Sequence, residues 1–244
     1  MGAEEFIVRL LPIFSNLVFL APSARALEWE YPIDSFLWAL VALFTSPSYH
    51  LCYGFDACLW SVDKHRVVDF WSAEMAMPVV ALYFIRFRTP FIRTWFLLVS
   101  FLAIGLLVTG TDSSFMNQAV IAAVSGAVVV AYLLWHNWAH GYFPEYDMKQ
   151  LVLGIGFLVM GICFFVVQEW WPPYYGYNHA YWHACDGIGI YFMIGIRPPN
   201  SKIPGGAAYP LMEKRVIGSS IFAQMPRGPV RFNPRGEPVT VSRV

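Results

Sequence analysis

Seven long apolar segments, separated by short polar stretches, run through the first 196 residues of this 244-residue chain. Most of them approach the roughly 20 residues that a helix needs to cross the hydrocarbon core of a bilayer. Only 13% of the residues are charged, against about 25% in typical soluble domains, so the chain cannot coat a water-exposed surface. We therefore predict an all-α, polytopic membrane protein with seven transmembrane helices. The predicted spans are residues 5–22, 32–53, 67–85, 92–110, 115–136, 150–168 and 178–196.

Positive charges are distributed unevenly between alternate loops. Thirteen Lys and Arg residues fall on one side of the predicted membrane, eight of them in the C-terminal tail, whereas only Lys64 and Arg66 fall on the other. Because cytosolic loops carry the excess of Lys and Arg in membrane proteins, we predict that the N-terminus is outside and the C-terminus cytosolic. The overall balance of 16 basic and 16 acidic residues gives no reason to expect a nucleic-acid partner.

The two ends of the chain differ from its middle. The first apolar run ends in an Ala-Arg-Ala sequence that resembles a signal-peptide cleavage site, but acidic Glu4 and Glu5 do not fit a basic leader, so we favour a first membrane span. Residues 1–196 form the predicted seven-helix membrane domain, and residues 197–244 form a Pro/Gly-rich, basic cytosolic tail. Such a tail cannot bury enough apolar surface to fold alone. If it is ordered, we expect that a protein partner contacts it.

Five polar residues interrupt the apolar segments, and the predicted topology brings all of them to the outer leaflet. Two pairs are spaced four residues apart, which is about one helical turn, so each pair shares one face of its helix. Ionisable groups inside a membrane span are costly and mark a functional site by default. The five candidate site residues are Ser46, His50, Asp69, His179 and His183.

The residue types in this group match a catalytic metal centre. Three histidines with an open fourth position are how proteins hold catalytic Zn²⁺, so we predict His50, His179 and His183 as its ligands. Asp69 is the candidate catalytic residue that takes a proton from water, or alternatively orients a ligand histidine. Ser46 is the candidate that hydrogen-bonds the water or the developing oxyanion. Pro47 between Ser46 and His50 is expected to bend the helix.

Each histidine pair could also have a purely structural role without a metal, because imidazoles in an apolar helix also bond backbone carbonyls or stack on aromatic rings. The chain offers a comparison in His136 and His140, which have the same spacing at the opposite end of the predicted bundle. Trp135, Trp138 and Tyr142 flank this pair, so an interfacial aromatic belt explains it without a metal.

Other polar residues within the predicted spans are weaker candidates. Asp186, one turn beyond His183, is either an outer partner of the site or a contact for a polar lipid head. We expect Glu74, Asn117 and Gln118 to form hydrogen bonds between helices. Glu169, in an outer loop, is expected to line the entrance to the site.

The cysteines do not form a metal-binding cluster. Cys52 and Cys58 lie near the predicted outer loop, where a disulfide forms if the compartment is oxidising. Cys163, in the sixth predicted span, is interpreted as a core residue.

Three short motifs carry a resemblance to a known superfamily. S-P-S-Y-H-L-C (46–52), V-V-D-F-W (67–71) and H-A-Y-W-H (179–183) resemble the CREST-type seven-helix hydrolases, which include alkaline ceramidases and adiponectin receptors. Members share a Ser-x3-His, an Asp and a His-x3-His around zinc. The chain is most similar to the branch of transmembrane protein eight and myomaker, through the stretch 10–22 and the Glu169-Trp170 approach to the histidines. The resemblance covers about residues 5–196.

The resemblance and the five residues together lead to alternative functions. The first is a zinc-dependent intramembrane lipid hydrolase, ceramidase-like or phospholipase-like, that cleaves an ester or amide bond of a membrane lipid in the outer or luminal leaflet. The second is a non-enzymatic membrane component, either a myomaker-like fusogen or an accessory subunit, in which zinc is structural. A seven-helix receptor ranks third. The expected location is an endomembrane or the plasma membrane.

Overall fold

The structure is a computed structural model that describes residues 2–85, 87, 90–110, 114–197, 231–232 and 238–239. It divides into two compact units, Met1–Ile203 and Pro204–Val244. In the second unit, β1 (Arg231–Phe232) pairs antiparallel with β2 (Pro238–Val239). The remainder of the tail predicted from residue 198 onward lies outside the described residues, so its proposed protein partner stays a prediction.

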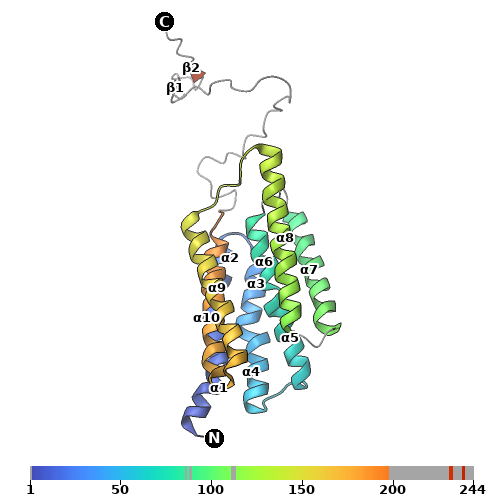
Figure 1. Cartoon of the computed structure of the whole chain (residues 1–244), viewed down its shortest axis with the longest axis vertical. Helices are drawn as coiled ribbons and strands as arrows, with labels where there is room; N and C mark the ends of the chain where they lie inside the picture. The colour runs from blue at the N-terminus through green and yellow to red at the C-terminus, as the bar shows by residue number, and fades with distance from the viewer. Residues whose placement is uncertain are drawn as a thin grey trace. The chain divides into compact units, whose positions relative to one another are not determined.

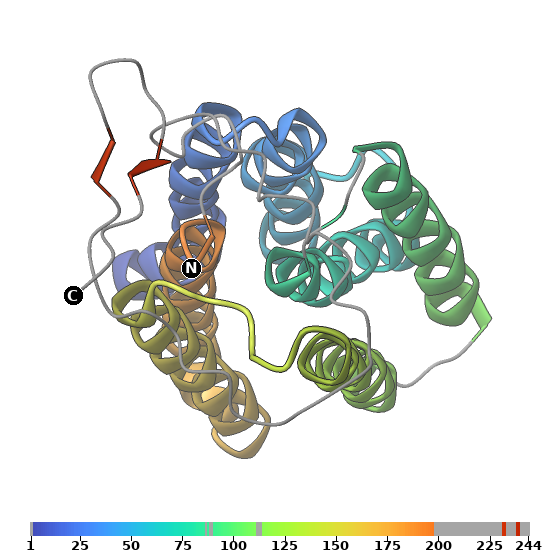
Figure 2. The ribbon, with the colours of Figure 1, turned by 90° about the horizontal axis from the view of Figure 1, so that it is seen from above.

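The first unit is a bundle of helices that run alternately up and down along one axis (Figure 1). Seen from above, α10 lies between α9 on one side and the α1–α2 segment on the other, and it packs against all three (Figure 2). The helical elements are α1 (Ala3–Ser15), η1 (Asn16–Phe19), α2 (Leu20–Glu28), α3 (Pro32–Leu40), η2 (Val41–Thr45), α4 (Ser46–Phe55), α5 (Val62–Glu74), α6 (Ala76–Phe84), α7 (Pro90–Gly110), α8 (Ser114–His140), α9 (Met148–Trp170), η3 (Pro172–Tyr174) and α10 (Tyr175–Ile194).

The described residues of the first unit form helices and no strands, and five of these helices are long and apolar enough to cross a membrane. They match the first, third, fourth, fifth and sixth predicted spans, and most extend several residues beyond the predicted apolar runs. The five are Ala3–Glu28, Val62–Phe84, Phe91–Gly110, Asn117–His140 and Met148–Gln168.

Two further helical segments have a similar length but a lower apolarity. They are residues 32–55, formed by α3, η2 and α4 in succession, and α10. The first carries His50, and the second carries His179 and His183, so the candidate site residues themselves reduce their hydropathy.

Two prolines interrupt long helices next to functional side chains. Pro47 has no backbone N–H, and its ring crowds the carbonyl four residues earlier, so the preceding residues widen into the π-helix η2 (Val41–Thr45). The predicted bend at Pro47 is therefore a π-helical segment immediately before Ser46. Pro78 crowds the carbonyl of Glu74 in the same way, and the helix breaks at Met75 between α5 and α6.

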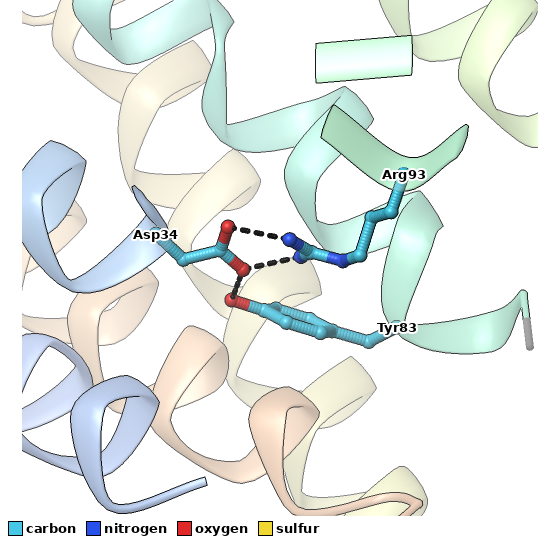
Figure 3. A network of polar contacts seen from close by, with 3 residues as sticks. All are labelled: Asp34, Tyr83 and Arg93. Carbon is cyan, nitrogen blue, oxygen red and sulfur yellow. Dashed lines mark hydrogen bonds and ion pairs between the residues drawn. The ribbon is translucent and has the colours of Figure 1, made fainter. Parts of the chain in front are cut away.

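A buried polar network joins α3, α6 and α7 near the end of the bundle where α3 begins (Figure 3). The Arg93 guanidinium donates to both carboxylate oxygens of the fully buried Asp34, with a distance of 2.9 Å from Nη1 to Oδ1. The Tyr83 hydroxyl donates to Asp34 Oδ2 at 2.8 Å. The Arg93 guanidinium also lies 4.6 Å from the ring centre of Tyr31, a cation–π contact. Three helices are thus pinned around one carboxylate.

The outward faces of the helices are strongly apolar. Large side chains such as Leu106, Phe36 and Val152 are more than half exposed, which suits a surface covered by lipid rather than water. Cys163 is also exposed, on the outward side of α9, so the prediction that it lies in the core was wrong. Both the lipid-facing and the buried face of a membrane helix are apolar, so the residue type of Cys163 does not indicate which face it lies on.

Candidate metal centre

Three buried histidines from two separated segments converge inside the bundle. His50 comes from α4, and His179 and His183 come from successive turns of α10. One ring nitrogen from each lies within 4.8 Å of the other two, and the three together form the metal-binding type of cluster that the sequence predicted. All three side chains are at most 5% exposed, so bulk water does not compete for their nitrogens.

The spacing of the nitrogens suits tetrahedral coordination of a metal cation. His179 Nε2 and His50 Nε2 are 3.1 Å apart. Two nitrogens bound to one zinc at about 2.0–2.1 Å with a tetrahedral angle lie about 3.3 Å apart, so the observed geometry is close to that of a zinc site. The rings of His50 and His183, with centres 5.6 Å apart, complete a compact triangle.

Hydrogen bonds to the outer ring nitrogens fix the orientation of the two α10 histidines. His179 Nδ1 donates to Gln168 Oε1 at 2.8 Å, at the end of α9. His183 Nδ1 bonds Ser15 Oγ at 2.9 Å, and because the Ser15 hydroxyl itself donates to the Pro12 carbonyl, its oxygen accepts from His183. A proton on each Nδ1 leaves both Nε2 lone pairs for a cation, which is the usual arrangement around zinc-binding histidines.

Sequence reasoning did not identify Ser15 or Gln168 as site residues. Ser15 lies in the middle of the first predicted span and Gln168 at the end of the sixth, and their partners lie 168 and 11 residues away. The only available signal in the sequence was the polar amide of Gln168 at the end of an apolar run, three residues before Trp171.

Ser46 and Asp69 form a second buried polar pair, which is linked to the histidines through α4. The Ser46 hydroxyl donates a hydrogen bond to the Asp69 carboxylate, and both side chains are buried. Ser46 begins α4 one turn before His50, so this pair sits on the helix that delivers one of the histidines. Among the described residues, the close metal-binding cluster contains the three histidines and not Asp69. This favours a role for Asp69 beside the metal rather than as a ligand.

A glycine allows α10 to approach α1 closely at the site. A Cβ added to Gly176 would lie 2.5 Å from the Val8 carbonyl oxygen, so no other residue fits there without movement of the backbone. This contact places α10 against the helix that carries Ser15. Aromatic rings of Tyr175 and Trp182, each centred 4.9 Å from that of His179, enclose the histidines.

A disulfide bond closes the segment that follows His50. Cys52 in the last turn of α4 is bonded to Cys58, which is the disulfide expected from the sequence in an oxidising compartment. The bond ties the end of α4 to the loop before α5. It therefore restrains the helix that presents His50.

The other predicted candidates have different surroundings. His136 Nδ1 lies 3.0 Å from the Tyr142 carbonyl oxygen, in an aromatic cluster with Trp135. The prediction of an interhelical hydrogen bond for Glu74 was wrong. Both of its carboxylate oxygens lack a hydrogen-bond partner among the described residues, and the residue lines a cavity. Asn117 is buried, Gln118 lines that cavity, and the Glu169 side chain lies outside the described residues.

The fold and the site define a class: a multi-helical membrane-type protein with a buried three-histidine cluster. The chain belongs to the DUF3522 family, a family of proteins of unknown function, whose model matches residues 4–184. This match includes every residue of the candidate metal centre. A comparison with curated proteins found no match.

Proposed function

We propose that this protein is a zinc-dependent intramembrane lipid hydrolase of the CREST-type superfamily. The observation that carries the proposal is the convergence of His50, His179 and His183, with the outer nitrogens of two of them already hydrogen-bonded. The proposed branch is that of transmembrane protein eight and myomaker, on the motifs around these residues. A Zn²⁺ ion held by three imidazoles supplies a Lewis acid that polarises a carbonyl and acidifies water.

The residues around the histidines provide the remaining chemistry. Asp69 accepts the proton of the attacking water and returns it to the leaving group, as a general base and then a general acid. The single hydroxyl proton of Ser46 holds the Asp69 carboxylate in place. Once Asp69 has taken up the proton of the water, this donor becomes available to the developing oxyanion, one helical turn before His50 on α4. Because the site is buried between helices whose outer faces are apolar, a lipid reaches it laterally from the bilayer. We therefore propose a lipid ester or amide as the substrate.

We further propose seven membrane crossings, with the N-terminus outside and residue 197 at the cytosolic side. Residues 32–55 and α10 have a suitable length. Residues 32–55 run antiparallel to the α1–α2 segment, and α10 runs antiparallel to α9 (Figure 1), which supports counting both as crossings. The disulfide Cys52–Cys58 supports an oxidising compartment at the end that holds the histidines. The excess of Lys and Arg in the other loops supports the same orientation. An endomembrane or the plasma membrane meets both conditions.

A lipid-panel assay tests the proposal. Purified protein in nanodiscs is incubated with ceramides, phospholipids and lysophospholipids, and released fatty acid is measured by mass spectrometry. We expect wild type to hydrolyse at least one of these lipids and His183→Ala to hydrolyse none. Zinc bound by wild type without turnover of any lipid would contradict the hydrolase and favour the non-enzymatic alternative, in which zinc only holds α4 and α10 together.

A further inference from the structure

A second internal site lies beside the metal centre and shares none of its histidines. It is a partly open cavity of about 400 Å³ lined by α5, α6, α8, α9 and α10. This volume falls within the range of about 300–1,000 Å³ that is typical of small-molecule sites. Its walls are almost entirely apolar, with side chains such as Met77, Val80 and Ile162. Two carboxylates, of Glu74 and Asp186, interrupt these walls.

Glu74 is the less easily explained of the two carboxylates. Its side chain is 1% exposed, and neither carboxylate oxygen has a hydrogen-bond partner among the described residues. A buried carboxylate without partners is costly, since it has lost its water and gained nothing in return. The break at Met75 that Pro78 imposes places Glu74 on the cavity wall. Among the described residues, the Glu74 carboxylate is therefore an unpaired acceptor on the wall of a partly open, largely apolar cavity.

Asp186 brings a second carboxylate to the same cavity from α10. It lies three residues after His183, and its carboxylate packs directly over Gly161 of α9, where an added Cβ would clash with it. It also forms a hydrogen bond with the side chain of Trp182, another residue of the cavity wall. Asp186 is thus held in position by its neighbours, and it remains on the cavity surface.

The charge of the cavity indicates what would bind there. None of the described residues that line it is basic, so no side chain on its wall compensates the two acids. A primary ammonium group has a positive charge and three hydrogen-bond donors, enough for both carboxylates. The indole of Trp182 on the same wall adds a favourable surface for a cation. The apolar remainder suits an alkyl chain.

We propose that this cavity binds a long-chain primary amine, with its ammonium group between Glu74 and Asp186 and its alkyl chain along the apolar walls. The proposal stands on the cavity and its carboxylates, and it does not require the metal centre to hold zinc or to be catalytic. A fatty alcohol of the same length, which has the chain without the charge, is the matched comparison ligand.

Binding of hexadecylamine to the full chain in nanodiscs tests the proposal, with empty nanodiscs as background and hexadecan-1-ol as the comparison. We expect saturable binding of one amine per chain, weakened about 10- to 100-fold in Glu74→Gln, because a hydrogen bond to a charged group is lost. Ser125→Ala, which removes a neutral polar group from the same cavity, is expected to bind as wild type does. Equal affinity for amine and alcohol, or unchanged amine binding by Glu74→Gln, would overturn the proposal.

Two further measurements keep the test independent of folding and of the metal centre. Glu74→Gln without ligand should melt at or above the temperature of wild type, because it neutralises an unpartnered buried group; a lower melting temperature would show that Glu74 has a structural partner and is not a ligand-binding group. His183→Ala should keep its affinity for hexadecylamine even where it loses lipid turnover. Loss of amine binding in His183→Ala would place the amine at the histidines and overturn the separate site.

Discussion

Replacing Asp69 by asparagine is expected to reduce lipid hydrolysis by about 10²- to 10⁴-fold, the usual contribution of a general acid–base group. Asparagine keeps the size of the side chain and can still bond Ser46, but it cannot accept a proton from water. Because the close metal-binding cluster contains the three histidines and not Asp69, the variant should bind as much zinc as wild type. Initial rates on the lipid that wild type hydrolyses, together with the metal content of the same sample, measure both expectations.

Asp63→Asn provides the matched control for this variant. Asp63 lies on the same helix as Asp69, but its side chain is exposed and pairs only loosely with Arg66. Its loss should leave both zinc content and turnover unchanged. If Asp69→Asn kept full turnover, the assignment of the proton-accepting role would be wrong. If it lost zinc and turnover together, Asp69 would instead act by orienting a ligand histidine.

The second large expected effect is a loss of protein stability on replacing Asp34, at the end of the bundle opposite the histidines. Asp34→Ala should destabilise the protein by about 3–5 kcal/mol, because it leaves the Arg93 guanidinium buried without its carboxylate partner. Tyr83→Phe removes one hydrogen bond from the same carboxylate and should cost only about 1 kcal/mol. Thermal unfolding of the purified variants, followed by circular dichroism, gives the order of their melting temperatures.

A double variant distinguishes two causes of lost stability: the loss of the Asp34–Arg93 ion pair, and the unpaired charge of Arg93 that remains after Asp34→Ala. Asp34→Leu combined with Arg93→Met replaces both partners by apolar side chains of similar size, and such replacements are often neutral. We expect it to be clearly more stable than Asp34→Ala. If Asp34→Ala unfolded at the temperature of wild type, the network in Figure 3 would not hold α3, α6 and α7 together.

The sequence was sufficient to predict the histidine cluster because helix periodicity and the alternation of the spans both leave a pattern in the sequence. A spacing of four residues places His179 and His183 on one helix face, and alternation of the spans brings His50 to the same end of the bundle. The helical fold followed from the length and apolarity of the runs. The disulfide between Cys52 and Cys58 also joins neighbouring residues.

Features that depend on contacts between distant segments could not be predicted in the same way. Asp34 meets Arg93 across 59 residues of sequence, and Ser15 meets His183 across 168. Nothing in the local pattern of a single polar residue says which neighbouring helix will face it. For Glu74, the prediction of a hydrogen bond failed because its carboxylate lies on the wall of a cavity and meets no polar group of a neighbouring helix among the described residues.

The most direct test of the account is the zinc content of the purified full chain, measured by elemental analysis beside that of His183→Ala. We expect close to one zinc ion per wild-type chain and essentially none in the variant, since the two imidazoles that remain hold zinc far less tightly than three. Wild-type protein that carried no zinc after incubation with the metal, or a variant that carried as much zinc as wild type, would contradict the assignment of His50, His179 and His183 as a metal centre.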